Sequence, residues 1–149
     1  MRELVFALEF KGTAAPVPGA ANRLRARTSA ADQTLRTALK ADGVQVGIDR
    51  SGADTATFES EVEIVTEGAF VESGSITYGA AGKVTFKTVG QGLLVPGPMP
   101  GVQRGAVIWE ITGGDGRFRG AQGLITSNFT VGAAGEVTDD QFARLYLPS

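Results

Sequence analysis

Residues 113–123 of this chain read GGDGRFRGAQG, the densest run of turn-forming residues in the sequence. Five of these eleven residues are glycine, which suits turns that need a positive φ or that leave no room for a side chain. We expect the positive φ at Gly116, and we expect the ring of Phe118, the only large apolar residue in the run, to be buried against the end of the fold. The flanks, residues 106–112 (AVIWEIT) and 124–131 (LITSNFTV), are rich in β-branched and aromatic residues. The stretch therefore predicts a strand, an ordered turn and a second strand.

Glycine-rich loops also bind phosphate groups in nucleotide-binding proteins, where a strand precedes the loop and a helix follows it. Here the glycine spacing does not fit G-x-G-x-x-G, a strand-like run follows the loop, and the Walker lysine is missing. We therefore expect no nucleotide cofactor.

The pattern G-G-x-G-x-F-x-G-A-x-G in residues 113–123 resembles the motif near the C-terminal end of allene oxide cyclases and dirigent proteins. The resemblance covers these eleven residues and their flanking strands, and the chain is also similar to small bacterial proteins that share the run ITSNF at residues 125–129. It implies an eight-stranded antiparallel β-barrel, usually oligomeric. Because the motif residues shape a turn, the resemblance transfers no catalytic residue to this chain.

Composition predicts one all-β domain over residues 1–149 and excludes several kinds of chemistry. The 21 glycines are about twice the usual share of ~7%, as in turn-rich β folds. The net charge of −2 and the scattered basic residues give no footprint for nucleic acid. With no cysteine and no histidine, the chain has no disulfides, no thiol or imidazole catalysis and no zinc site of the Cys/His type. Asp, Glu, Tyr and Lys remain as proton carriers, and we expect no metal.

The N-terminal apolar stretch, residues 4–8, is too short for a signal peptide, and no run approaches the ~18 residues of a membrane span. We therefore expect a cytoplasmic protein that does not interact with membranes.

Alternating apolar and polar residues predict strands along most of the chain, with glycine turns every 8–12 residues. The proline-containing residues 12–21 are expected to form a loop, and residues 50–54 a hairpin turn. Residues 34–42 fit either a helix or a strand, and the β neighbours favour the strand. The whole pattern predicts an antiparallel barrel of about eight strands with at most one short helix.

Two strands have apolar residues on both faces. Residues 106–112 place Val107, Trp109 and Ile111 on one face and Ala106 and Ile108 with Glu110 on the other, and residues 141–147 repeat the two-sided pattern. A second subunit is the simplest cover for the outer faces of a closed barrel, so we expect a homo-oligomer, a dimer or a trimer.

The barrel mouth is the expected site, lined by aliphatic and aromatic residues and suited to a small apolar molecule. Glu110, next to Trp109 in the most apolar strand, is the first candidate for a catalytic acid, because desolvation would favour its protonated form. An ion pair at a subunit interface is the alternative role for Glu110. Tyr78 and Asn128 are further candidates for orienting a carbonyl group. The chain would then cyclise or isomerise its ligand; the alternatives are a non-catalytic carrier and a filled barrel without a ligand.

Overall fold

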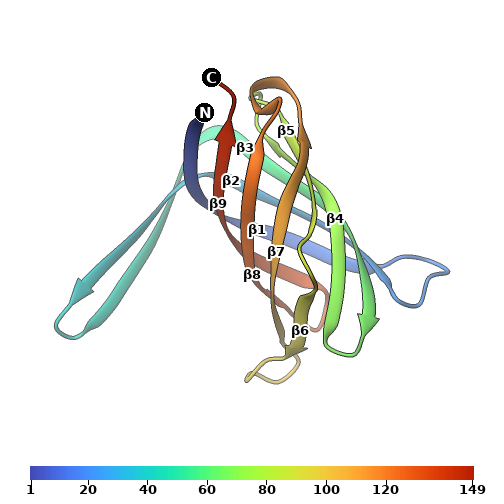
Figure 1. The fold of residues 1–149 in the computed structure, drawn as a ribbon. Helices are drawn as coiled ribbons and strands as arrows, with labels where there is room; N and C mark the ends of the chain where they lie inside the picture. Colours follow the sequence, from blue (N-terminus) through green and yellow to red (C-terminus); the bar gives the residue numbers. More distant parts are fainter.

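The computed structural model describes all of residues 1–149 as a single antiparallel sheet of nine strands (Figure 1). The strands are β1 (Arg2–Pro16), β2 (Arg23–Lys40), β3 (Gly43–Thr66), β4 (Ala69–Tyr78), β5 (Lys83–Thr88), β6 (Gly92–Pro96), β7 (Gln103–Gly114), β8 (Gln122–Val131) and β9 (Glu136–Leu147). One turn of 3₁₀ helix, η1 (Gly116–Phe118), lies between β7 and β8. The all-β prediction is confirmed. The structure has no helix with the length and hydropathy that crossing a membrane would need.

The sheet closes into a barrel of eight positions. Its order runs β3-β2-β1-β9-β8-β7-β5-β4, and β4 also pairs with β3 to complete the ring. The short strands β5 and β6 share one position, because each of them pairs with β4 on one side and with β7 on the other. The ninth strand therefore fits within an eight-stranded architecture.

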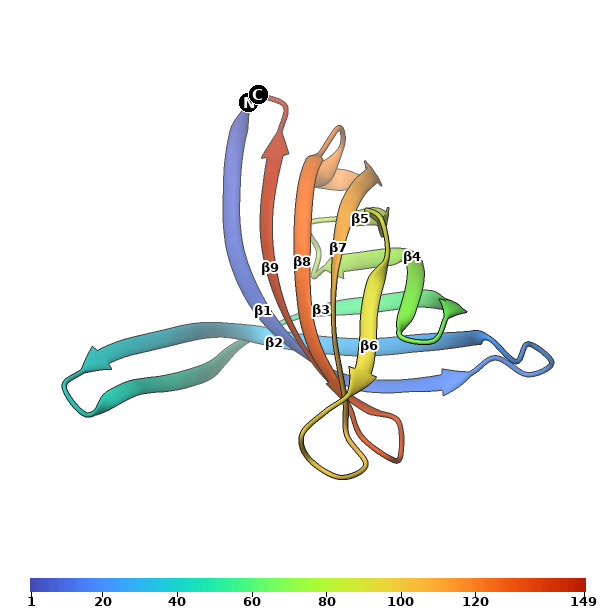
Figure 2. The ribbon, with the colours of Figure 1, turned by 60° about the horizontal axis from the view of Figure 1, so that its bottom comes forward.

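The two ends of the barrel differ. The plug end carries the chain termini, the turn after β7 and the connection from β4 to β5 (Figure 1). Phe118 is 6% exposed there, and its ring lies 5.2 Å from that of Tyr78. Gly116 has φ of +57°, and a Cβ at this position would meet the carbonyl oxygen of Ala81. The predicted burial of Phe118 and the predicted conformation of Gly116 are both confirmed. The connections at residues 17–22, 67–68, 97–102 and 132–135 lie at the other end, called the cavity end below (Figure 2).

Period-two alternation fills the interior with large side chains. Phe58, Phe86 and Trp109 pack with ring centroids 4.5–5.4 Å apart, and Phe10 packs against Phe58. These residues come from strands on different sides of the ring, so they join the walls into one hydrophobic core. On the outside, the arginines of β2 face the glutamates of β3 in register, as in Arg25 paired with Glu61 at 3.2 Å.

A long two-stranded arm leaves the barrel where β2 and β3 continue past their neighbours (Figure 2). It comprises residues 33–50, and the strand interpretation is confirmed for residues 34–40, while residues 41–42 form the turn. The expected hairpin turn at residues 50–54 is wrong. The chain runs straight through it within β3, opposite a register shift between Ala31 and Gln33, and the reversal comes at residues 41–42.

The expected loop at residues 12–21 is too long at its N-terminal end. Strand β1 continues to Pro16, which pairs with Leu24 as the last residue of the strand. Proline is tolerated at a strand end, where a missing N–H group breaks no ladder.

Candidate functional site

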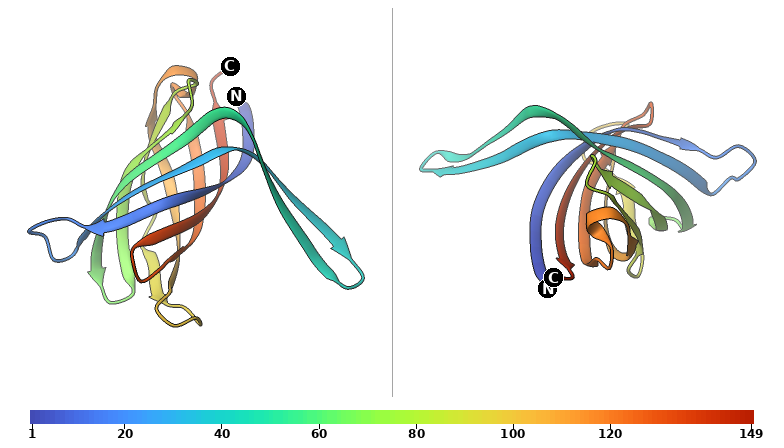
Figure 3. Two further views of the ribbon diagram at one scale, coloured as in Figure 1. Left: turned by 180° about the vertical axis from the view of Figure 1, so that it is seen from behind. Right: turned by 90° about the horizontal axis from the view of Figure 1, so that it is seen from above.

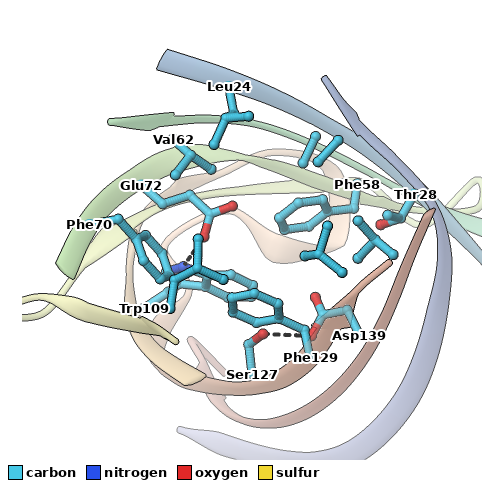
Figure 4. Close-up of a pocket in the computed structure, with 15 residues that line it drawn as sticks. Leu24, Thr28, Phe58, Val62, Phe70, Glu72, Trp109, Ser127, Phe129 and Asp139 are labelled. Atoms are coloured by element: carbon cyan, nitrogen blue, oxygen red, sulfur yellow. Dashed lines mark hydrogen bonds between the residues drawn. The ribbon is translucent and has the colours of Figure 1, made fainter. Parts of the chain in front are cut away.

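A cavity of about 70 Å³ opens at the cavity end of the barrel. Its wall is mostly apolar and includes Leu94. Figure 4 shows four more of its apolar residues, Leu24, Val62, Phe70 and Phe129. The volume admits a few water molecules but lies well below the ~300 Å³ at which small-molecule sites begin. A ligand larger than a few atoms would therefore have to displace side chains at the mouth or insert only part of its structure.

Glu72 projects from β4 into this apolar cavity. Its two oxygens accept hydrogen bonds from Ser60 Oγ at 2.5 Å and from Trp109 Nε1 at 3.1 Å. The pKa of the Glu72 carboxyl is raised to about 7, mainly by burial; the hydrogen bond from Ser60 opposes the rise, and the charge of the nearby Asp139 contributes to it. Glu72 can therefore hold or release a proton near neutral pH.

Asp139 on β9 has an equivalent environment. Ser127 Oγ donates to Asp139 Oδ1 at 2.5 Å, and Gln141 Nε2 donates to Asp139 Oδ2 at 2.8 Å. Burial raises the pKa of the Asp139 carboxyl to about 6, against the effect of these two hydrogen bonds. Both carboxyl groups are thus held in fixed orientations by a serine and an N–H donor.

The two carboxyl groups come from facing walls of the barrel. Three positions of the eight-position ring separate β4 from β9 in either direction. Figure 4 shows both groups pointing into the same cavity, with Trp109 beside Glu72 and Ser127 beside Asp139. The pKa of Glu72 lies above that of Asp139, so Glu72 is the candidate acid and Asp139 the candidate base.

Thr28 on β2 is a further polar residue of the wall. Its Oγ1 is buried and has no hydrogen-bond partner in the protein. An unpaired buried hydroxyl is costly, so a water molecule or a ligand oxygen is its expected partner.

Glu110 lies on the outer surface of β7, so the expectation that it sits in the desolvated interior is corrected. Its side chain is 47% exposed, and its Oε1 is 3.3 Å from the Nζ of Lys87 on the neighbouring strand. Because successive strand residues point to opposite faces, the residue next to the buried Trp109 must point outward.

The structure does not bring the three predicted residues together. Tyr78 lies inside the barrel but at the plug end, where burial raises the pKa of its phenol and its ring packs edge-on against Phe6 at 5.3 Å. It does not line the cavity with Glu72; it borders an open hollow beside the base of the arm. Asn128 is exposed on the outer face of β8.

Glu72 and Asp139 carry a signal that sequence reasoning missed. Glu72 shares a strand face with Phe70 and Ile76, both buried, so it interrupts an otherwise apolar period-two row. Asp139 likewise shares a face with Val137, but the last strand was expected to start only at residue 141. A carboxylate in an inward row is the pattern to look for.

The site has the donors for general acid–base chemistry and not those for a metal centre. No group of three or more Asp and Glu side chains is arranged so that it could hold a metal ion.

The loop at residues 97–102 joins the adjacent strands β6 and β7 and supplies none of the residues that line the cavity.

No family model matches the chain, and no curated protein matches it. Among solved structures, the chain is similar to that of a pterocarpan synthase dirigent protein, with a TM-score of 0.60 and 10% sequence identity. The match covers 99% of this chain and 90% of the other. At this identity the likeness concerns the fold alone, and it supports the predicted dirigent-like barrel.

Proposed function

We propose that this protein binds a small, largely apolar molecule at the cavity end of the barrel and moves a proton on it with Glu72 and Asp139. The observation that carries the proposal is the pair of buried carboxyl groups on facing walls of one apolar cavity. Buried titratable groups with shifted pKa values in a cavity are typical of functional sites. The similar fold of a pterocarpan synthase is consistent with this function.

The reaction class that fits is isomerisation or cyclisation of an unsaturated carbonyl compound. Asp139, the carboxyl with the lower pKa, would remove a proton from the carbon next to the carbonyl group. Protonated Glu72 would donate a hydrogen bond to the carbonyl oxygen as negative charge develops there. Asp139 would then return the proton to the far end of the dienolate, so that no other reagent is consumed.

The test uses cyclohex-3-enone as a probe, because moving one proton converts it to the conjugated isomer, which absorbs in the ultraviolet. We expect conversion above the buffer rate near pH 6.5, a loss of roughly a hundredfold or more in Asp139→Asn, and a smaller loss in Glu72→Gln. Glu110→Gln, which removes a carboxylate from the outer face, is the matched control and should convert the probe like the unmodified protein. Loss of conversion in Glu110→Gln with full conversion in Asp139→Asn would contradict the proposal.

A second candidate is a carrier that holds its ligand without chemistry, because the wall of the cavity is mostly apolar. Trp109, the only tryptophan, donates a hydrogen bond to Glu72, so its fluorescence reports on the site. A carrier would change Trp109 emission when the probe binds and would exchange no probe hydrogen for deuterium in D₂O. Emission unchanged by the probe would favour a filled barrel.

A further inference from the structure

The arm of residues 33–50 has one aliphatic face that nothing in the chain covers. In register, Leu35 lies opposite Ile48, Thr37 opposite Val46, and Leu39 opposite Val44, so all six side chains share one face. Leu39 is 83% exposed and Val46 is 79% exposed. The opposite face is polar, with residues such as Thr34, Arg36 and Gln45. An isolated two-stranded hairpin is only marginally stable in water, so this face is expected to need a partner.

The outer wall of the barrel carries a second uncovered apolar surface, called the body face here. It crosses β1, β9, β8 and β7, and its exposed members are Val5, Phe142, Leu124 and Ile108. Strand pairing sets Thr126 between Phe142 and Ile108, so this row of the body face carries no charge. In the neighbouring row Arg144 lies between Val5 and Leu124, and Leu124 lies beside Glu110. The β2–β3 wall, in contrast, is covered by arginine–glutamate pairs.

The arm cannot cover the body face of its own chain. At its base, Glu9 N donates to Gln33 Oε1 at 2.8 Å, and Arg50 Nη2 lies 2.8 Å from Glu9 Oε1. These contacts fix the direction of the arm, which stands away from the outer wall in the view from above (Figure 3). Two apolar surfaces of one chain that cannot meet within it are suited to meet between two copies.

We propose that two copies of this chain form a dimer in which the arm of each lies on the body face of the other. The size of the surfaces favours a reciprocal contact. Eight residues per strand and two strands give an arm face of roughly 26 by 10 Å, or about 500 Å² for one arm with its partner surface. Two such contacts reach the ~1,000 Å² expected of a specific interface, whereas one contact does not.

Charge also favours a second copy over a charged partner. The ions on the body face are already paired within the chain: Arg144, between Val5 and Leu124, lies 3.0 Å from Glu3, and Glu110, beside Leu124, lies 3.3 Å from Lys87. The body face therefore offers an apolar row beside ions that need no outside partner, which fits the aliphatic face of the arm.

The test begins with sedimentation of four proteins at micromolar concentration. We expect the unmodified chain to be a dimer. The double variants Leu39→Asp/Val46→Asp on the arm and Ile108→Asp/Phe142→Asp on the body face should each raise the dissociation constant by roughly a hundredfold or more. Gln45→Asp, on the polar face of the arm, is the matched control and should remain a dimer. Circular dichroism checks that each variant is folded. A monomeric unmodified chain, or a folded arm variant that stays dimeric, would overturn the proposal.

Cysteine cross-linking identifies which surfaces meet, because the native chain has no cysteine. A Val46→Cys protein mixed with a Thr126→Cys protein should form the mixed disulfide under mild oxidation. Val46→Cys mixed with Ser73→Cys, which places the second thiol on the exposed side of β4, should not. Disulfides only between two Val46→Cys chains would overturn the arm-to-body contact in favour of an arm-to-arm contact. Binding of a monomeric chain to phosphatidylcholine vesicles through Leu39 would overturn it in favour of a membrane surface.

Discussion

Glu72 makes the stability of the barrel depend on pH. Burial raises the pKa of its carboxyl from an ordinary 4.5 to about 7. Between these values the folded chain keeps the proton and the unfolded chain releases it, so the free energy of unfolding falls as the pH rises. The contribution of Glu72 is present below about pH 4.5 and is lost by about pH 7.

We therefore expect Glu72→Gln to flatten the pH dependence of stability. The unmodified protein should lose up to roughly 3 kcal/mol across this window from Glu72 alone. Urea denaturation at several pH values measures the slope, and Glu110→Gln is the control because that carboxylate is on the outer face. Equal slopes in the Glu72→Gln variant and the unmodified protein would show that Glu72 titrates in its ordinary range.

Phe118 closes the plug end, where it contacts Tyr78 and is nearly fully buried. Phe118→Ala should lower the free energy of unfolding by about 3–5 kcal/mol through lost transfer energy and the cavity left behind. Asp115 Oδ1 accepts a hydrogen bond from Lys83 N at 2.8 Å, and the amide oxygen of an asparagine can accept the same bond. Asp115→Asn should therefore change stability little. Thermal denaturation compares the two variants. If Phe118→Ala left the stability unchanged while Asp115→Asn abolished ligand binding, the turn at residues 113–123 would be the ligand-binding site.

Single residues were predictable where local chemistry decides them. Phe118 and Gly116 follow from the turn motif itself. The prediction that Glu110 is buried was wrong, because sequence neighbours on a strand lie on opposite faces. The position of Glu110 next to Trp109 in the sequence therefore said nothing about its burial. Glu72 and Asp139 are 67 residues apart in the sequence and lie on strands that do not pair, so only closure of the barrel brings both to one cavity, and no local pattern shows this.

At the scale of elements, strand periodicity predicted nearly every strand but not where strands continue past their neighbours. The sequence predicted a hairpin turn at residues 50–54, because the serine, glycine and aspartate there are typical of such turns. In the structure the same residues lie at the register shift where the arm leaves the barrel. Turn-forming residues thus mark an irregularity, and only pairing with β2 shows whether the chain reverses.

The arm should be dispensable for folding of the barrel. Gln33 and Arg50 face each other in register, so an Asn-Gly turn can join them in place of residues 34–49. Because no residue of the arm belongs to the buried core, the shortened chain should keep its monomer stability within roughly 1 kcal/mol. Denaturation at a concentration where the shortened chain is monomeric tests this. Failure of that chain to fold would show that the arm belongs to the folding unit of the barrel.

For the whole molecule, the barrel architecture was predictable from glycine turns and alternating strands, and the structure fills its eight positions. The sequence did not predict how far side chains fill the barrel interior, because this depends on how aromatic rings from separate strands pack. Phe70 and Phe129, from β4 and β8, meet at 6.0 Å beside the cavity. Phe70 packs directly over Gly92, where a Cβ would clash with the ring. The absence of a side chain at Gly92 therefore sets how deeply Phe70 sits in the wall.

Two changes at this contact should alter the cavity in opposite directions. Phe70→Leu removes part of a ring that lines the cavity, so it should tighten binding of cyclohex-3-enone while lowering stability by about 1–3 kcal/mol. Gly92→Ala pushes the same ring inward and should weaken binding. Trp109 fluorescence measures binding, and denaturation measures stability. Val84→Ala, at a fully buried position outside the cavity, is the control and should lower stability without changing binding. If Phe70→Leu and Gly92→Ala, like the control, change stability but not binding of the probe, the interior is a filled core. The two carboxyl groups are then buried there without a ligand.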